Sequence, residues 1–422
     1  MNKKLIHTIF LSIVFTLMLG LNAQGQNGAF IYGKVKLRNS SEIEGHIRWA
    51  AGQSLWVDLL LAEKKDNTIL QYLSKEDLRQ LSASEKKTDW SFMALWENQY
   101  PNRKLTFRSQ FGNIRQLTVT GANEATIRLK NNHDIRIFIN EDVEYKNQLG
   151  KDLVIVTADQ KKVTVKWEDL QSIVFLQEKA PNPNGNSPLY GKVETRFGYF
   201  YSGLIKWDMD EYLSQQYLDG TSIDHRHIRH QFAEVKSIRP KNHGSLIQLQ
   251  SGKEIYMDDH PNVNNTNAGI QIRNPLWGQI TLQWGDFKNA HFSPVPAHTS
   301  SGTGYSYSDF RTPKPLRGSL TLKDNSTISG AIFYDLDERW DIETLDAWAQ
   351  GGGLLQIPFR EIKKITPLND SQSKVLLRSG ELITLGDRSD VNSQNWGIMI
   401  QKSDETFQYF PWAKIKEISF IH

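Results

Sequence analysis

The chain has 422 residues, a formal net charge of +3 and no cysteine. Such a balanced charge gives no electrostatic basis for nucleic acid or an anionic membrane as a partner. Without cysteine, disulfides and thiolate metal sites are excluded, so the fold depends on its hydrophobic cores. A chain of this length is too long to fold around a single hydrophobic core, so we expect about two to four domains.

The first 23 residues have the order of a secretory signal peptide. Lys3 and Lys4 precede an apolar run over residues 5–21, and the small residue Ala23 follows. This order predicts an exported protein that loses residues 1–23. The alternative is an uncleaved anchor helix, because the run is near the lower limit for spanning a bilayer. After cleavage we expect no integral membrane segment and a periplasmic, outer-surface or secreted location.

A short apolar pattern occurs six times along the chain. Each copy begins with Phe or Trp, and the residues three and six positions later are also apolar. The copies begin at Phe111, Trp167, Phe232, Trp284, Phe359 and Trp412. A spacing of three fits one 3₁₀ turn between two strands, and a long amphipathic helix is the competing interpretation. Because Phe and Trp copies alternate, we expect three repeats, each made of two halves.

The expected repeats cover residues 30–178, 189–293 and 315–422, and are called repeats 1, 2 and 3. Each begins with two glycines twelve positions apart around a polar turn, which is typical of a β-hairpin. These glycines are Gly33 and Gly45, Gly191 and Gly203, and Gly318 and Gly330. Each half carries about five short strands, enough for one small barrel. Residues 177–189 and 293–315 have the Pro, Ser and Gly content of linkers, which are flexible unless they pack.

An excursion of variable length follows the first hairpin of each repeat. In repeats 2 and 3 it is short, and we expect one helix capped by Asp208 or Asp335. In repeat 1 it is long, covers residues 50–106, and contains expected helices around residues 55–62 and 90–96. The expected fold class is therefore all-β with short helical excursions, in three repeats of two small five-stranded barrels.

Residues 201–212 read Tyr-Ser-Gly-Leu-Ile-Lys-Trp-Asp-Met-Asp-Glu-Tyr. This stretch resembles the first motif of Sm-like barrels, which has a glycine, an aliphatic strand and an aromatic-Asp pair. The resemblance covers the first halves only and implies an Sm-like or SH3-like fold. The asparagine with which that family contacts RNA has no match, since Glu211 lies in that region, and the Arg-Gly second motif is missing. The repeat also looks like exported Bacteroidota-type proteins built from tandem small β-barrels, a resemblance that implies no activity.

Two acidic clusters occupy equivalent positions at the start of the excursions. They are Asp208, Asp210 and Glu211 in repeat 2, and Asp335, Asp337 and Glu338 in repeat 3. Clustered carboxylates suit Ca²⁺, but acids at the start of a helix also cap it and complement its dipole. Because the spacing of an EF-hand is missing and repeat 1 lacks the cluster, we favour the structural interpretation and predict no metal or cofactor. We expect His225, His227 and His230 to lie in a solvated basic loop rather than to form a metal site.

Tryptophans are the other candidates for ligand contacts. Those that begin the Trp copies are expected in the core, and Trp284 in particular should be buried. Those in the excursions are candidate surface aromatics for a glycan or a peptide: Trp56, Trp90, Trp96, Trp340 and Trp348.

The sequence contains neither a nucleophile elbow, nor a phosphate loop, nor a zinc-binding His-Glu pair. A carboxylate pair for glycoside hydrolysis can still be assembled from distant residues, although active sites seldom come in three near-equivalent copies. We therefore expect a non-catalytic, exported binding or scaffold protein of the cell envelope, which presents its excursions to a protein partner. A glycan-binding module is the alternative, and a polysaccharide-active enzyme is less favoured.

Overall fold

The computed structural model describes residues 28–49, 52–66, 68–86, 105–138, 149–178, 187–296 and 305–421. Antiparallel strands dominate these residues, which contain one α-helix, α2 (Lys75–Lys86). The expected all-β class is confirmed. No described helix has the length and hydropathy to cross a membrane. The expected signal peptide, the helix around residues 90–96, Trp90 and Trp96 lie outside the described residues.

Among the described residues, each repeat contributes ten strands. Repeat 1 contains β1 (Tyr32–Leu37), β2 (Glu42–Trp49), β3 (Leu59–Lys64), β4 (Thr106–Gln110), β5 (Ile114–Gly121), β6 (Glu124–Leu129), β7 (Asp134–Phe138), β8 (Leu153–Val156), β9 (Lys162–Val165) and β10 (Leu170–Phe175). Repeat 2 contains β11 (Tyr190–Thr195), β12 (Phe200–Lys206), β13 (Tyr217–Thr221), β14 (His227–Gln231), β15 (Val235–Lys241), β16 (Gly244–Leu249), β17 (Glu254–Met257), β18 (Ile270–Asn274), β19 (Gly278–Leu282) and β20 (Phe287–Phe292). Repeat 3 contains β21 (Arg317–Leu322), β22 (Thr327–Tyr334), β23 (Thr344–Ala349), β24 (Leu354–Pro358), β25 (Ile362–Pro367), β26 (Gln372–Leu377), β27 (Leu382–Gly386), β28 (Ile398–Gln401), β29 (Phe407–Phe410) and β30 (Ile415–Ile421).

The strand pairings outside the excursions recur in each repeat. The last strand lies between the first strand and the strand that follows the Phe copy, so β10 pairs with β1 and β5, β20 with β11 and β15, and β30 with β21 and β25. The second strand pairs with the eighth, as in β2 with β8, β12 with β18, and β22 with β28. One topology therefore recurs along the chain.

The two halves of each repeat interlock, because the last strand of the second half pairs with two strands of the first. The ten strands of repeat 1 form one open sheet from β4 to β9, and pairing of β19 with β24 joins repeats 2 and 3 in an 18-stranded sheet. The described strands thus form no closed barrel, and the expected pair of five-stranded barrels per repeat is wrong. Apolar spacing reports local strand–turn–strand units, but it carries no information on which distant strands pair.

The expected strand–turn–strand units are present at all six copies. Five begin with a 3₁₀ turn: η3 (Phe111–Asn113), η4 (Trp167–Asp169), η5 (Phe232–Glu234), η8 (Phe359–Glu361) and η10 (Trp412–Lys414). The sixth, at Trp284, is a hydrogen-bonded turn in which the N–H of Phe287 donates to the Trp284 carbonyl. All six leading aromatic residues are buried, as expected of core positions.

The paired glycines face each other across the first hairpin of each repeat. Gly33 lies opposite Gly45, and the other two pairs match in the same way. A Cβ atom on Gly33 would lie 2.6 Å from the carbonyl oxygen of Val174, and one on Gly45 would lie 2.4 Å from that of Val156. Glycine is therefore required because a neighbouring strand packs closely against the hairpin.

The excursions of repeats 2 and 3 are β-hairpins rather than the expected helices, and that of repeat 1 is a hairpin whose long connection contains α2. They are β3–β4, β13–β14 and β23–β24. Asp208 and Asp335 do not cap a helix, because each is the first residue of a tight turn with positive φ (50° and 49°) that continues at Met209 and Leu336. Asp tolerates this conformation in turns. Around residues 55–62 the structure has a turn followed by β3, and the described helix of repeat 1 is α2.

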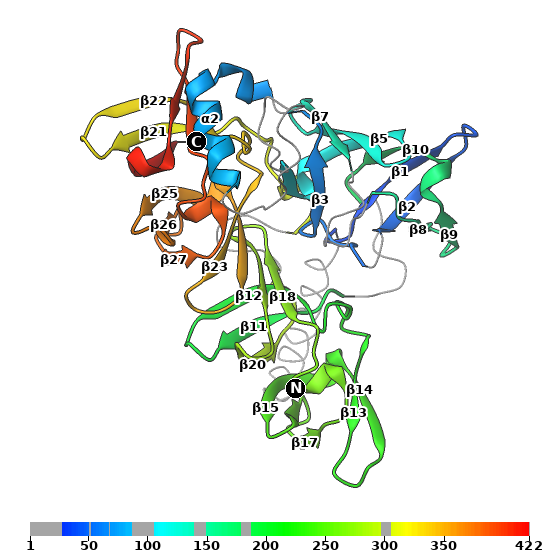
Figure 1. Cartoon of the computed structure of the whole chain (residues 1–422). Coiled ribbons are helices and arrows are strands. Elements are labelled where there is room, and N and C mark those ends of the chain that lie inside the picture. The colour runs from blue at the N-terminus through cyan, green and yellow to red at the C-terminus, as the bar shows by residue number, and fades with distance from the viewer. Residues whose placement is uncertain are drawn as a thin grey trace, which may run out of the picture.

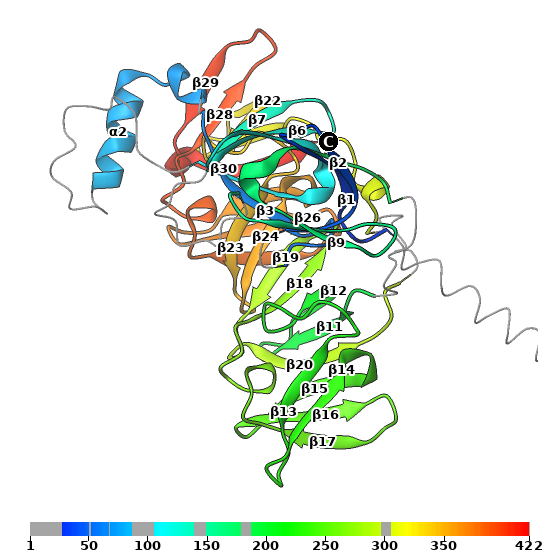
Figure 2. The same ribbon diagram turned by 90° about the vertical axis from the view of Figure 1, so that its right-hand side faces the viewer.

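The repeats pack against one another and are not separated by flexible linkers. Of the segment between repeats 2 and 3, Tyr305 and Phe310 are buried, and the ring of Tyr307 lies 4.6 Å from that of Trp56 in repeat 1. Figure 1 shows repeats 1 and 3 side by side, with repeat 2 extending below them. Figure 2 shows α2 of repeat 1 beside β29 of repeat 3, where Leu81 joins a small apolar cluster with residues of repeat 3.

Candidate functional site

One hydrogen-bond motif opens all three excursions. A side-chain oxygen accepts hydrogen bonds from two successive backbone N–H groups three and four residues earlier. The acceptors are Asp58 (from Ser54 and Leu55, 2.7 and 2.9 Å), Gln216 (from Tyr212 and Leu213, both 2.8 Å) and Glu343 (from Arg339 and Trp340, 2.7 and 2.9 Å). We call this motif the clamp. It fixes the turn before each excursion hairpin and aligns the three repeats residue by residue.

The clamp residues differ in what their second side-chain atom binds. The other oxygen of Asp58 pairs with Arg273 of repeat 2, and that of Glu343 pairs with Lys64 of repeat 1. Both pairs are buried. Gln216 is neutral, and its amide nitrogen contacts the carbonyl of Asp210 within its own turn at 3.4 Å. Two clamps therefore join repeats by ion pairs, and the third, in repeat 2, does not.

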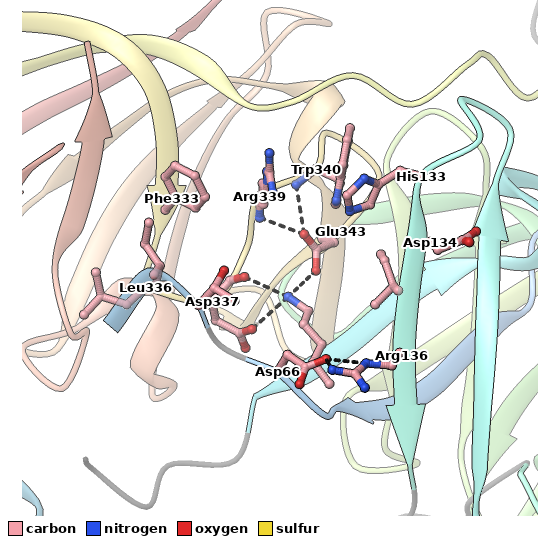
Figure 3. Close-up of a pocket in the computed structure, with 14 residues that line it drawn as sticks. Asp66, His133, Asp134, Arg136, Phe333, Leu336, Asp337, Arg339, Trp340 and Glu343 are labelled. Atoms are coloured by element: carbon pink, nitrogen blue, oxygen red, sulfur yellow. Dashed lines mark hydrogen bonds and ion pairs between the residues drawn. The ribbon is translucent and has the colours of Figure 1, made fainter. Parts of the chain in front are cut away.

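A pocket of about 270 Å³ lies beside the Glu343 clamp, between repeats 1 and 3. Figure 3 shows Asp337 and Glu343 on one side of the pocket and His133 beside Trp340. The ammonium group of Lys64 donates to a carboxylate oxygen of Asp337 at 2.8 Å and to its carbonyl at 2.7 Å. At the rim, Arg136 pairs with Asp66 (2.7 Å), and the rings of His133 and Trp340 lie 4.6 Å apart.

The charges in this pocket are set by burial and by mutual pairing. Burial alone would lower the pKa of Lys64, but the carboxylates of Asp337 and Glu343 outweigh it and hold that pKa above its ordinary value. Burial raises the pKa of Glu343, and the charge of Lys64 opposes this effect. Burial and the nearby Arg339 lower the pKa of His133. Lys64 is thus cationic and His133 neutral at pH 7.

A lysine held in its charged form is neither a nucleophile nor a base. The volume of the pocket also lies just below the range of roughly 300–1,000 Å³ that is typical of ligand sites. Its polar side chains are used to bond repeat 1 to repeat 3. The pocket is therefore best explained as a junction that fixes the repeats relative to one another.

The acidic cluster of repeat 2 surrounds a tight turn. Carboxylate oxygens of Asp208, Asp210 and Glu211 lie within 4.8 Å of one another, a spacing that a hard cation can bridge. However, Asp208 accepts hydrogen bonds from the N–H of Ala268 (2.6 Å) and the amide of Asn262 (3.1 Å), and Asn262 also donates to Glu211 (3.1 Å). Burial and the adjacent Asp210 raise the pKa of Glu211 to about 9. A proton therefore relieves the repulsion in this cluster.

The equivalent cluster of repeat 3 is more deeply buried. Asp335 accepts a hydrogen bond from the N–H of Trp396, as Asp208 does from Ala268. Asp390 stands where repeat 2 has Asn262, so no amide donor is present at that position. Asp337 faces Lys64 instead, and Glu338 is only 5% exposed. Burial and the charges of Asp337, Asp390 and Asp335 raise the pKa of Glu338 well above its ordinary value.

We expect Glu338→Gln to stabilise the protein at neutral pH. The folded state holds the Glu338 proton to a higher pH than the unfolded chain, so ionisation makes stability fall as pH rises above about 4.5. The amide carries no such penalty. Thermal melts should therefore coincide near pH 4 and separate in favour of the variant as pH increases. A constant difference across this range would mean that Glu338 ionises at its ordinary pKa.

We also expect Glu211→Gln in repeat 2 to raise the melting temperature relative to the parent chain. This difference should increase with pH up to about pH 9.

Two of the three candidate tryptophans that can be placed are buried rather than surface aromatics. Trp56 is fully buried and lies 6.0 Å from the ring of Phe175. Trp340 is 7% exposed and packs against repeat 1 through His133. Trp348 is half-buried on β23. The sequence did not distinguish aromatics that bind a partner from those that pack one repeat on another, because both lie in excursions.

Exposed aromatic side chains occur instead at the turn of β11–β12 in repeat 2. Phe197 is 60% exposed and Phe200 is 55% exposed, and Tyr199 lies against the turn at Gly351 of repeat 3. The corresponding turns are polar in repeat 1 (residues 38–41) and repeat 3 (residues 323–326). This difference between the three first hairpins is visible in the sequence, but it lies in phenylalanine and tyrosine rather than in tryptophan.

No protein-family model, no curated protein sequence and no solved structure shows significant similarity to the chain.

Proposed function

We propose that the chain is a non-catalytic binding or scaffold protein of the cell envelope, which presents the excursion of repeat 2 to a protein partner. The observation that supports this most is the unequal use of three equivalent excursions. In repeats 1 and 3 the clamp residue that opens the excursion forms a buried ion pair with another repeat. In repeat 2 this residue is the neutral Gln216, and no ion pair among the described residues joins the excursion to another repeat. At the start of this excursion, the Tyr212 hydroxyl lies 3.2 Å from that of Ser54 in repeat 1.

The excursion of repeat 2 is separate from the main sheets. β13 and β14 form their own two-stranded sheet, attached to the end of β17 by the pairing of Thr221 with Asp258. Figures 1 and 2 show this hairpin at the end of the molecule that is far from α2. Its turn exposes Ile223 (77%), and Tyr217 at the start of β13 is 37% exposed. An exposed aliphatic side chain at such a tip is typical of a contact surface.

The buried pairs between repeats support a scaffold. They hold three repeats in a fixed arrangement, so a partner bound at one hairpin would be presented in one orientation. The expected signal peptide supports a location in the envelope. The charged side chains around Lys64 pair with one another and join repeats 1 and 3, whereas an enzyme would need such groups for acid–base catalysis.

A pull-down from envelope extracts tests this function, with the full exported chain as bait. We expect one defined protein to be retained, and Ile223→Asn to lower its recovery roughly fivefold to tenfold, as for loss of an apolar side chain at an interface centre. Leu382→Asn, at another exposed aliphatic site, on β27 of repeat 3 (58%), should leave recovery unchanged. Recovery of no defined protein, or equal losses for both variants, would contradict the proposal.

Glycan binding is the second candidate, because Phe197 and Phe200 provide exposed aromatic rings. It predicts retention on polysaccharide that is lost in the double variant Phe197→Ser, Phe200→Ser and kept in Ile223→Asn. The same pair of variants in both assays therefore separates the two functions.

A further inference from the structure

We propose that the outer edge of β14 binds an extended segment of the partner as an additional antiparallel strand, with an acidic residue facing Arg229 and an aliphatic residue facing Ile228. This inference rests on the proposed function, which it makes more specific.

The equivalent edge is already used in this way inside the molecule. In repeat 3 the excursion strand β24 pairs with β19 of repeat 2, with Gln279 opposite Gln356, Ile280 opposite Leu355 and Thr281 opposite Leu354. This pairing joins two repeats by strand addition, in which backbone hydrogen bonds supply affinity and alternate side chains supply selectivity. The contact is therefore a template for the matching edge in repeat 2.

The clamp fixes which residues correspond. The N–H of Phe232 donates to the carbonyl of Gln216, and that of Phe359 donates to the carbonyl of Glu343, both at 2.9 Å. β14 ends directly before Phe232 and β24 ends directly before Phe359. Arg229 is therefore the counterpart of Gln356, and Ile228 is the counterpart of Leu355.

The outer edge of β14 carries no strand. β14 pairs with β13, and no other described strand pairs with it. In such a ribbon every second residue directs its N–H and C=O away from the partner strand. No described strand therefore occupies the outer edge of β14, whereas the equivalent edge of β24 pairs with β19.

The side chains of β14 define the chemistry of the incoming strand. Arg229 and His227 have side chains 54% and 63% exposed and share the solvent face, where they also share the Asp219 carboxylate of β13 at 3.8 and 3.4 Å. Ile228, on the other face, packs against the core of repeat 2. Residues opposite each other in an antiparallel pair share a face. An acidic residue opposite Arg229 and an aliphatic one opposite Ile228 therefore match both faces.

A second copy of the chain fits this edge poorly. The strands equivalent to β19 are β9 and β29, since each of the three ends two positions before the Trp of its copy. In the template register β9 would place Lys162 opposite Arg229, and like charges in that position are unfavourable. β29 would place Phe407 there, but Phe407 already stacks 3.7 Å from the ring of Tyr72. A segment of another protein is favoured instead.

The test uses a fluorescein-labelled peptide with the sequence of residues 276–284, which include β19, carrying Gln279→Glu. We expect saturable binding to the full chain by fluorescence anisotropy, with the amide signals of His227 and Arg229 shifted in NMR spectra. Arg229→Glu should weaken binding about tenfold, since an attractive cross-strand pair becomes repulsive. A peptide with Gln279→Lys should recover the loss in that variant. Arg226→Glu, at an exposed site in the turn of the same hairpin, is the matched control.

Absence of saturable binding, or equal weakening by Arg226→Glu and Arg229→Glu, would overturn the strand-addition inference. Equal affinity of the Glu and Lys peptides for the unaltered chain would overturn the proposed charge preference. If Ile223→Asn still reduces capture in the pull-down while the peptide does not bind, the proposed function stands and only this mode of binding fails.

Discussion

Replacing Arg273 with Ala is expected to lower the free energy of unfolding by about 3 to 5 kcal/mol, the usual effect of removing one partner of a buried ion pair. Arg273 is fully buried on β18, and its guanidinium pairs with Asp58 of repeat 1. Without it, the Asp58 carboxylate keeps its two clamp hydrogen bonds but loses its cationic partner in a site with little access to water. Chemical denaturation followed by tryptophan fluorescence measures the loss.

Two further variants distinguish a lost ion pair from a general packing defect. The double variant Asp58→Asn, Arg273→Met removes both charges and keeps an oxygen for the clamp, so it should recover most of the lost stability. Arg128→Ala breaks an exposed pair with Asp134 and should leave the transition nearly unchanged. A double variant as unstable as Arg273→Ala would show that the side-chain volume of Arg273, rather than its charge, is required.

The local elements of this fold are readable from the sequence because their causes are local. A large aromatic followed by apolar residues at a spacing of three predicts a buried turn, and Phe111, Trp167 and Phe232 all begin one. Paired glycines predict the first hairpins, since a side chain at Gly33 or Gly45 would collide with a neighbouring strand. The all-β class follows from these units.

Contacts between repeats were not predictable in the same way. Asp58 and Arg273 are separated by 215 positions, and neither belongs to the repeated apolar pattern. The sequence predicts helix caps at Asp208 and Asp335 where the structure has left-handed turns, because the Asp side chain favours both. Once the clamp is known, the sequence difference between Asp58, Gln216 and Glu343 identifies the excursion without an ion pair. That signal appears only after the three repeats are aligned by structure.

Replacing Trp284 with Ala is expected to cost about 3 to 5 kcal/mol, as for other truncations of large buried aromatic residues. Trp284 is 7% exposed, and its ring lies 5.2 Å from that of Phe287 and 6.2 Å from that of Trp207. The burial expected from the sequence is confirmed. Removal of the indole leaves a cavity between two aromatic rings that cannot close without shifting the strands on either side.

The loss should spread beyond repeat 2, contrary to the expectation that linkers would confine it. Residues of repeats 2 and 3 form one continuous apolar core, and β19, which leads into Trp284, pairs with β24 of repeat 3. Hydrogen exchange of the variant should therefore show weaker protection in β23 and β24 as well as in β18 to β20, because a cooperative unit opens together. Faster exchange confined to repeat 2 would mean that the shared sheet does not couple the two repeats. Unchanged exchange and melting would mean that Trp284 contributes to a surface rather than to the core.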